Sequence, residues 1–574
     1  MESRAAAHVL TEIATLRQLG GHDDATTAAF LAVARELSQG GVRPLAPSPA
    51  HADPLVAAVL ADLVATGESA LLDHLREETP EGLQALLRVP GLGPVTLHRL
   101  HAGLGVSTLA DLEEAVRDGR VAALPHFGAR TADRVRKAIA QLRATGAPVL
   151  LPHADAEAAR LSQAIVALDG VASCRIAGDV ARRRETITEL RLVVACTRPP
   201  VEVATRIAAL RGVTSAHGIA TASVTLHFAD ATTARVECVP RAQLVLATWR
   251  ATGSDEHVRS VLARLAERGV RVQGGELRDA SGTSMMLADD AALYALAGLA
   301  HVPAELREGA GEVEAAAEGT LPHLIELPAL RGVLHCHSSW SDGGSSIDAL
   351  ARAAHARGWR YLGISDHSRS ALNAGGLSAE DVRRQHDEID AVNAAGGARA
   401  RVLKGIEADI LPCGRVDYDA TVLDRFDYVI ASVHTRFGLN AAQMTERVCK
   451  ALDDPHVTIL GHPTGRLLLT REPYALDMPT VLAHAAARGV AVELNADPHR
   501  LDLDWRWCRA ARDAGATIVI GPDAHSLAGL DNVTLGIDMA RKGWLEAGDV
   551  LNTRDSDDVL AFARRRRAAA LQPA

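Results

Sequence analysis

Apolar positions at the start of the chain recur with the spacing of α-helices. From about residue 5 to 145 they follow a period of about 3.6 residues, broken by short Gly/Pro segments such as residues 89–94. Strand-like runs come next, at Leu190–Ala195, Ala222–Phe228 and Ala234–Val239. We therefore predict an all-α domain over residues 1–145, followed by an α+β domain over residues 150–300.

Beyond about residue 330, apolar runs alternate regularly with helical stretches. The runs are Val333–Leu334, Tyr361–Ile364, Val402–Ile406, Tyr428–Val433, Val457–Leu460, Val490–Leu494 and Thr517–Ile520. Such strand–helix units in series predict a parallel barrel over residues 331–574, because parallel strands need helical crossovers. The acidic, alanine-rich stretch Glu305–Glu318 before it suggests that residues 301–330 form a linker.

Side chains suited to metal binding follow these runs. They are His335, His337, Asp366, His367, Glu407, His434, His462, Glu493, Asn495, Asp523 and His525. The C-terminal ends of parallel barrel strands open on one face, so these residues would converge although they lie far apart in sequence. Imidazoles with a few carboxylates suit Zn²⁺, Mn²⁺ or Fe²⁺. Neighbouring ions can activate a water and hold a phosphodiester.

The alternative for each position taken singly is a structural role. A lone histidine at a strand end is more often structural than functional, and Asp342-Gly343 could be an ordinary turn. Cys336 would point away from its two histidine neighbours and fill the barrel. The repetition over six or seven strand ends favours a multinuclear metal centre.

Composition restricts the class of protein. Apolar residues make up 48% and charged residues 23% of the 574 residues, which indicates a folded chain. The formal net charge of −10 means that any nucleic-acid binding must be local. The seven cysteines form no C-x-x-C pair, and no run of about 18 apolar residues or secretory signal is present. We expect a cytoplasmic protein without a membrane partner.

Two glycine-rich turns between predicted helices indicate DNA binding. Val89-Pro90-Gly91-Leu92-Gly93-Pro94 resembles a helix-hairpin-helix motif, whose backbone N–H groups and helix N-terminus can bind a DNA phosphate. Residues 124–131 resemble a second copy, with His126 where the first has Gly91. A plain turn is the alternative for either copy alone. The predicted DNA contacts are Gly91, Gly93 and Gly128.

The strand-end motifs after residue 331 resemble the PHP (polymerase and histidinol phosphatase) domain. They include His335-Cys336-His337, Ser365-Asp366-His367, Gly461-His462-Pro463 and Asp523-Ala524-His525. The resemblance implies a distorted (β/α)7 barrel with three divalent ions, Mn²⁺ or Zn²⁺, with Fe²⁺ as a further candidate. It implies that one ion is held by His335, His337, Glu407 and Asp523, the second by Asp342, His367 and His462, and the third by Glu407, His434 and His525.

The same resemblance assigns the chemistry to a metal-bound hydroxide held by His335, His337, Glu407 and Asp523. Arg466 and Asn495 follow strands on the same face, and we predict that they contact a substrate phosphate or sugar. Barrel-rim salt bridges or turns are the alternative for these two.

Residues 177–193 resemble the nucleotidyltransferase segment of bacterial family X DNA polymerases, and Thr252-Gly253-Ser254 resembles that family's nucleotide-binding turn. The order of helical module, palm, thumb and PHP domain matches that family over nearly the whole chain. The polymerase motif is degenerate, however. The family has Gly-Ser where this chain has Gly178-Asp179, and the three family aspartates fall on Glu189, Arg191 and Arg235.

Nucleotidyl transfer needs carboxylates that hold two Mg²⁺ ions, and arginine repels them. We therefore predict that the palm no longer synthesises DNA. The alternative is that Glu189 acts with Glu237 or Asp230.

Together these features predict a metal-dependent DNA phosphoesterase in DNA repair. We expect a 3′→5′ exonuclease on 3′ ends of gapped or damaged duplex, with AP endonuclease and 3′-phosphatase activity as further possibilities. The alternatives are an active gap-filling polymerase, a small-molecule phosphatase of the histidinol-phosphatase type and a non-catalytic DNA-binding scaffold. We expect a nucleoid-associated monomer, while the sequence leaves protein partners open.

Overall fold

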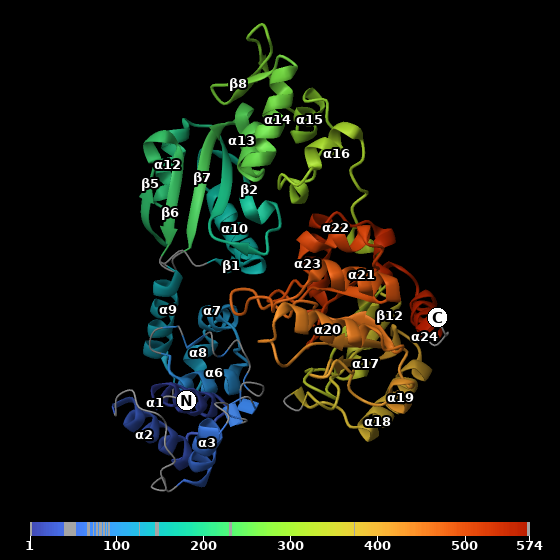
Figure 1. The fold of residues 1–574 in the computed structure, drawn as a ribbon. Helices are drawn as coiled ribbons and strands as arrows, with labels where there is room; N and C mark the ends of the chain where they lie inside the picture. The colour runs from blue at the N-terminus through green and yellow to red at the C-terminus, as the bar shows by residue number, and fades with distance from the viewer. Residues whose placement is uncertain are drawn as a thin grey trace. The chain divides into compact units, whose positions relative to one another are not determined.

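A computed structural model describes residues 3–39, 53–65, 69, 71–72, 74–75, 79, 83, 86–87, 89, 92–125, 127–143, 148–228, 232–371 and 374–570. The chain forms two compact units. One comprises Met1–Ala147 with Ala229–Ala231, and the other comprises Pro148–Phe228 with Thr232–Ala574. Figure 1 traces the chain through both. Among the described residues, none of the helices combines the length and apolar character needed to cross a bilayer.

The first unit is helical over its described residues, which confirms the predicted all-α module. Its helices are α1 (Ser3–Leu19), α2 (Ala25–Gln39), α3 (Pro54–Ala65), α6 (Pro94–Leu104), α7 (Leu109–Arg117), α8 (Arg120–Ala123) and α9 (Ala129–Arg143). Buried side chains such as Leu10, Phe30, Leu97 and Leu112 form one core. Residues next to the helices determine where they begin. Thr108, for example, accepts a hydrogen bond from the backbone N–H of Asp111 and caps the N-terminus of α7.

A five-stranded mixed sheet opens the second unit. Its strands are β2 (Val171–Ala177), β4 (Leu190–Cys196), β7 (Thr233–Pro240), β6 (Ser223–Phe228) and β5 (Val213–His217), in the order β2-β4-β7-β6-β5. Only β4 and β7 pair in parallel within it. One face packs on α10 (Leu151–Val166) and α12 (Pro200–Ala208) and the other on α13 (Leu244–Thr252). Alternate residues of β4 therefore face two different cores.

A small subdomain follows the sheet. It contains α13, α14 (Asp255–Glu267), the strands β8 (Arg271–Gln273), β9 (Glu276–Arg278) and β10 (Ser284–Met285), α15 (Asp290–Leu296) and α16 (Glu312–Glu318). The segment 301–330, for which we predicted a linker, places Val302, Leu306 and Val313 in the same core as Trp249. Buried His257 also hydrogen-bonds Glu312 over 2.6 Å. This segment packs because its apolar residues complete that core.

The seven-stranded parallel barrel is confirmed. Its strands are β11 (Gly332–Cys336), β12 (Tyr361–Ile364), β13 (Arg401–Asp409), β14 (Tyr428–Ser432), β15 (Val457–Leu460), β16 (Ala491–Asn495) and β17 (Ile518–Gly521), and they neighbour one another in chain order. A bridge between Cys336 and Ala524 brings the first strand back to the last. There the backbone N–H of His337 donates to the carbonyl of Ala524 over 2.9 Å.

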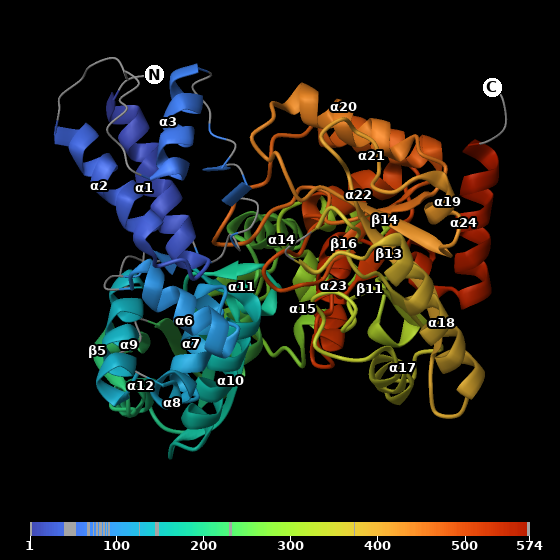
Figure 2. The ribbon, with the colours of Figure 1, turned by 90° about the horizontal axis from the view of Figure 1, so that it is seen from below.

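Helices enclose the barrel strands (Figure 2). They include α17 (Ile347–Ala356), α18 (Ala379–Ala395), α20 (Ala441–Leu452), α21 (Met478–Arg488), α22 (Trp505–Asp513), α23 (Val533–Lys542) and α24 (Ser556–Ala570). Tyr361 and Tyr428, at the first residues of their strands, pack with Leu560 and Ala563 of α24 in a separate core. Among the described residues, this core fills the N-terminal end of the barrel.

Buried ion pairs join the sheet domain to the barrel within the second unit. Glu308 lies 3.1 Å from Nε of Arg182 and 3.3 Å from Nη1 of Arg184, and it also contacts Nζ of Lys542 on α23. The Lys542 side chain is fully buried, and that of Glu308 is 9% exposed. Burial opposes ionisation of Glu308, but Lys542 and Arg182 hold its pKa below the ordinary value.

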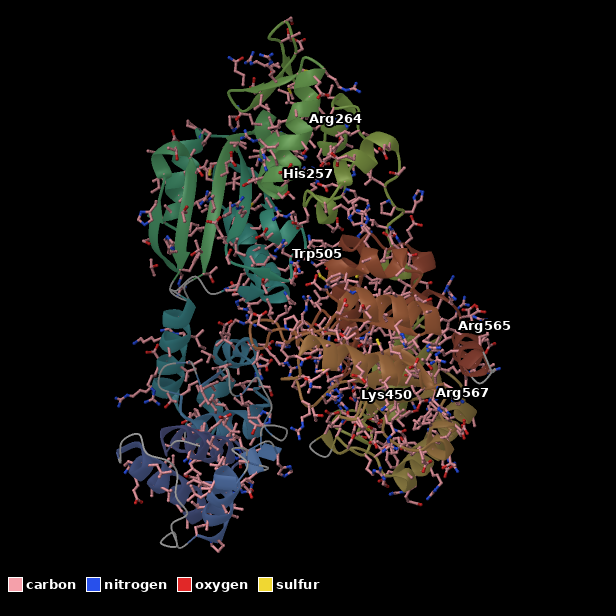
Figure 3. The ribbon with its side chains drawn as sticks, in the orientation of Figure 1. His257, Arg264, Lys450, Trp505, Arg565 and Arg567 are labelled. Carbon is pink, nitrogen blue, oxygen red and sulfur yellow. The ribbon has the colours of Figure 1, made fainter. Side chains whose placement is uncertain are left out.

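Glu185 makes a second connection of this kind. Its carboxylate accepts hydrogen bonds from Nε1 of Trp505 over 3.1 Å and from Nη1 of Arg506 over 2.9 Å, both on α22. Figure 3 labels Trp505. The segment Arg182–Glu185, which includes three consecutive arginines after β2, therefore connects the sheet domain to the barrel.

Replacement of Glu308 by glutamine removes the carboxylate that three cations share. Because unpaired buried charges are costly, we expect Glu308→Gln to lower the free energy of unfolding by roughly 3 kcal/mol or more in urea titrations. Glu380→Gln is the matched control, since Glu380 pairs with Arg383 at the surface and should change stability by less than about 1 kcal/mol. Equal losses in both variants would contradict a stabilising role for this contact.

Candidate metal centre

Side chains from six barrel strands meet around one buried carboxylate, that of Glu407. Its Oε2 lies 3.1 Å from Nδ1 of His367 and 3.4 Å from Nε2 of His335. Its Oε1 lies 2.8 Å from Nε2 of His462 and 3.3 Å from Nε2 of His434. Glu407 is 1% exposed. A carboxylate with imidazoles at both oxygens has the geometry of a bridging ligand.

Asp523 adds a second carboxylate beside the histidines of β11. Its Oδ1 lies 3.2 Å from Nε2 of His337 and 3.6 Å from Nε2 of His335. Both His335 and Asp523 adopt left-handed backbone conformations, with φ of 70° and 49°. Such conformations are unfavourable for residues with a side chain and are concentrated at functional sites.

Asp342 forms the outer part of the site. Its Oδ2 lies 3.3 Å from Nε2 of His525 and 3.5 Å from Nε2 of His367. Its Oδ1 lies 3.6 Å from Nδ1 of His337. Asp342 is about one-third exposed and His525 43% exposed, so this part of the site faces the barrel mouth.

Three groups of side chains are compact enough to hold an ion. Within each group, one ligand atom per residue lies within 4.8 Å of the others. The groups are His335 with His337 and Glu407; His367 with Glu407 and His434; and His337 with Asp342, His367 and His525. All nine predicted metal ligands thus lie in one constellation.

The predicted division of ligands between the second and third ions needs correction. We assigned His462 to the ion of Asp342 and His525 to that of His434. The structure exchanges them, because the His525 ring stacks on His337 at 4.2 Å and the His462 ring lies 5.2 Å from His434. The reason is barrel order. Strand β15 neighbours β14, whereas β17 returns to β11.

Buried nitrogen atoms provide a test of whether these residues fit metal ions. Nε2 of His335, both ring nitrogens of His337, Nδ1 of His367 and Nδ1 of His462 have no hydrogen-bond partner among the described residues. Buried polar atoms are rarely left unpaired, because their desolvation is costly. Burial, together with His525 and His367, lowers the pKa of His337 to about 3, so its ring is neutral as a ligand must be. The donor set therefore fits divalent ions.

Two carboxylates behind the ligands fix the orientation of imidazole rings. Nδ1 of His335 donates to Glu493 over 2.5 Å, and Nδ1 of His434 donates to Asp409 over 2.6 Å. Each contact turns Nε2 toward the centre, as outer carboxylates commonly do in metal sites. The sequence placed Glu493 only among the side chains suited to metal binding, and we assigned Asp409 no role. Asp409 could have been recognised, because it lies two residues after Glu407 on the same side of β13.

Neither predicted substrate contact faces the barrel mouth. Asn495 is fully buried and donates from Nδ2 to Asp523 over 3.0 Å, so it positions a ligand. Arg466 is 6% exposed and donates to the carbonyls of Arg500 and Leu501 and to Asp504. Arg466 therefore stabilises residues 500–504 after β16, as in the alternative in which it forms a salt bridge at the barrel rim. Arg500, which the sequence did not indicate, approaches Asp523 at 3.4 Å.

Asp366 also has a structural role. Its carboxylate accepts hydrogen bonds from the backbone N–H and the hydroxyl of Ser338 over 2.8 Å and 2.6 Å, and from Nε2 of Gln385 over 2.6 Å. It thus supports the loop that carries Asp342.

The degenerate polymerase positions carry internal ion pairs. Oε2 of Glu189 lies 3.2 Å from Nε of Arg191, and its Oε1 lies 3.4 Å from Nε of Arg235. Asp179 contacts the guanidinium of Arg182. Each of these two carboxylates thus already has a cationic partner within the protein.

Gly93 and Gly128 precede α6 and α9 in the helical unit. Neither has a positive φ, and a Cβ added to either would meet nothing within 4 Å. Backbone conformation and internal packing therefore do not require glycine at these positions. Gly91, the third predicted contact, and His126 lie outside the described residues.

Comparison with known proteins adds family relationships. Residues 334–496 match the PHP domain, and residues 83–141 match a SAM-like helix-hairpin-helix tandem. The chain is 36% identical over 510 residues to "DNA polymerase/3′-5′ exonuclease PolX" of Bacillus subtilis (strain 168), covering 88% of this chain and 89% of that protein. It is 32% identical over 200 residues to a "Probable phosphatase" of Shewanella sp. (strain ANA-3), covering 33% of this chain and 74% of that protein.

Replacement of Glu493 by glutamine tests the carboxylate behind His335. We expect Glu493→Gln to weaken Mn²⁺ binding by about 10- to 100-fold in calorimetric titrations, since loss of such an outer partner has effects of this size. Glu388→Gln is the control, because Glu388 accepts a hydrogen bond from Trp340 outside the ligand set. Unchanged Mn²⁺ affinity in Glu493→Gln would exclude this role.

Proposed function

Since the chain belongs to the PolX family of bacterial DNA polymerase/3′-5′ exonucleases, we propose that it is a metal-dependent DNA phosphoesterase acting on 3′ ends. The observation that carries this proposal is the constellation of nine predicted ligands, Glu407 and eight others, at the C-terminal end of the barrel. Gapped or damaged duplexes are the proposed substrates, with abasic sites and 3′-phosphates as further ones. Such a role would place the enzyme with the chromosome in the cytoplasm.

Three divalent ions, Mn²⁺ or Zn²⁺ with Fe²⁺ as a further candidate, would occupy the site. The first would be held by His335, His337, Glu407 and Asp523, the second by Asp342, His367 and His525, and the third by Glu407, His434 and His462. Ions in such a cluster activate a water and stabilise the leaving oxygen of a phosphodiester. The protein holds the ligands in place through Glu493, Asp409 and Asn495. Arg500, beside Asp523, could contact a phosphate oxygen.

The helical unit would bind DNA. Glycines that neither packing nor a positive φ requires allow close approach of the backbone, as phosphate binding at a helix N-terminus needs. In this proposal residues 1–145 bind DNA and residues 331–574 hydrolyse DNA. Residues 150–300 form a palm and thumb. The phosphatase relative matches only a third of the chain, and a small-molecule phosphatase would leave the helical unit unexplained.

We further propose that the palm has lost DNA synthesis. Two of the three family aspartates are replaced by Arg191 and Arg235, and both arginines pair with Glu189. A carboxylate between two guanidinium groups is a poor Mg²⁺ ligand, because the neighbouring positive charges repel the ion.

Exonuclease activity is tested with a 5′-labelled primer on a gapped duplex in the presence of Mn²⁺. We expect wild type to shorten the primer and His335→Ala to do so at least about 100-fold more slowly, because a buried ion ligand is lost. His355→Ala, at an exposed position of α17, should retain the wild-type rate. Equal rates for all three proteins would refute the assignment to the barrel.

Polymerase loss is tested in the His335→Ala variant, in which shortening no longer masks extension. With all four deoxynucleoside triphosphates and either Mg²⁺ or Mn²⁺, we expect the labelled primer to keep its length. A PolX relative with an intact aspartate triad serves as the positive control. Primers longer by one or more nucleotides would show that Glu189 still supports catalysis.

A further inference from the structure

A polar cavity lies between the five-stranded sheet and α13, away from the barrel. Its volume is about 520 Å³, within the range of small-ligand sites. Three arginines line it: Arg191 on β4, Arg235 on β7 and Arg250 on α13. Gln243 and Ser223 add further polar side chains, and apolar residues such as Leu246 and Val239 also line it.

The sheet register explains why these arginines gather. Strands β4 and β7 run in parallel with Arg191 opposite Arg235. Alternate residues of a strand share a face, so Arg235 lies on the same side as Val239, which packs against Ala247 of α13. Arg250 follows Ala247 by three residues, about one helical turn, and therefore reaches the same cavity.

The three arginines still have N–H groups that can donate hydrogen bonds to a ligand. Arg191 and Arg235 contact Glu189 through their Nε atoms. Guanidinium groups also carry terminal amino groups, which can bind an anion in a fork geometry. Arg250 makes no hydrogen bond or ion pair with any of the described residues. The side chains of Arg191 and Arg235 are 45% and 52% exposed, so a ligand can reach them.

The charge balance of the cavity favours an anion. Three arginines and one carboxylate, that of Glu237, line the cavity, and the carboxylate of Glu189 pairs with two of these arginines. Burial raises the pKa of Glu237, and Arg250 opposes the shift. A site for two divalent cations would need more carboxylates than guanidinium groups.

We propose that this cavity binds the phosphate of a nucleoside 5′-phosphate without any metal ion. Arginine suits this group because its planar fork matches two phosphate oxygens. The 5′-phosphate could belong to a free nucleotide or to the end of a DNA strand at a gap. Either source presents the same phosphomonoester to Arg191, Arg235 and Arg250. The palm is then an anion-binding module in place of a catalytic one.

Calorimetric titration of the full-length protein with dAMP in EDTA tests this site. EDTA keeps the barrel free of metal, so that metal-bound phosphate does not contribute to the signal. We expect wild type to bind dAMP and the Arg191→Gln/Arg235→Gln double variant to bind at least 10-fold more weakly. Arg250→Gln should also weaken dAMP binding. Because Arg250 is at an exposed helix position, this variant tests the site even where the double variant does not fold. Arg259→Gln, at an exposed ion pair on α14, should leave the affinity unchanged.

Competition with an oligonucleotide identifies the source of the phosphate. If a 5′-phosphorylated oligonucleotide displaces dAMP and its 5′-hydroxyl counterpart does not, the ligand is a strand end; if neither displaces it, the ligand is a free nucleotide. Absence of dAMP binding in EDTA, or equal affinity in wild type and Arg250→Gln, would overturn the proposal. Because no metal is present in these titrations, their failure would leave the exonuclease assignment untouched.

Discussion

Burial of the Glu407 carboxylate is the constraint on which the barrel site depends. A carboxylate with no exposure to solvent is costly unless cationic or hydrogen-bonding groups surround it. Burial opposes its ionisation, yet His335, His434 and His367 hold its pKa well below the ordinary value. Four imidazoles approach its two oxygens, and carboxylates behind two of them orient the rings. Removal of this one charge would leave the surrounding histidines without their common partner.

Much of this site follows from the sequence, because a parallel barrel brings its strand ends to one face whatever their separation along the chain. Eight of the nine predicted ligands could be identified on that basis, whereas Asp342 followed only from the family resemblance. Their division between ions could not, since it depends on which strands are neighbours and on the return of β17 to β11. Arg466 and Asn495 could not be distinguished from surface groups, because their partners, residues 500–504 for Arg466 and Asp523 for Asn495, are distant in sequence. The 301–330 segment packs against a core whose other members are distant in sequence.

The two domains of the second unit differ in how they handle charge. The barrel surrounds carboxylates with imidazoles, which in their neutral form are metal ligands. The sheet domain surrounds Glu189 with guanidinium groups and lines its cavity with arginine. The arginine-rich loop from Arg182 to Arg184 further ties the sheet domain to the barrel through Glu308. The sheet domain therefore also has a structural role, because these ion pairs connect it to the barrel.

The packing of α24 over one end of the barrel limits how a substrate can approach. Side chains fill that end of the barrel, so a DNA strand cannot pass through the barrel interior. A strand end must therefore enter the metal site and leave it from the same side.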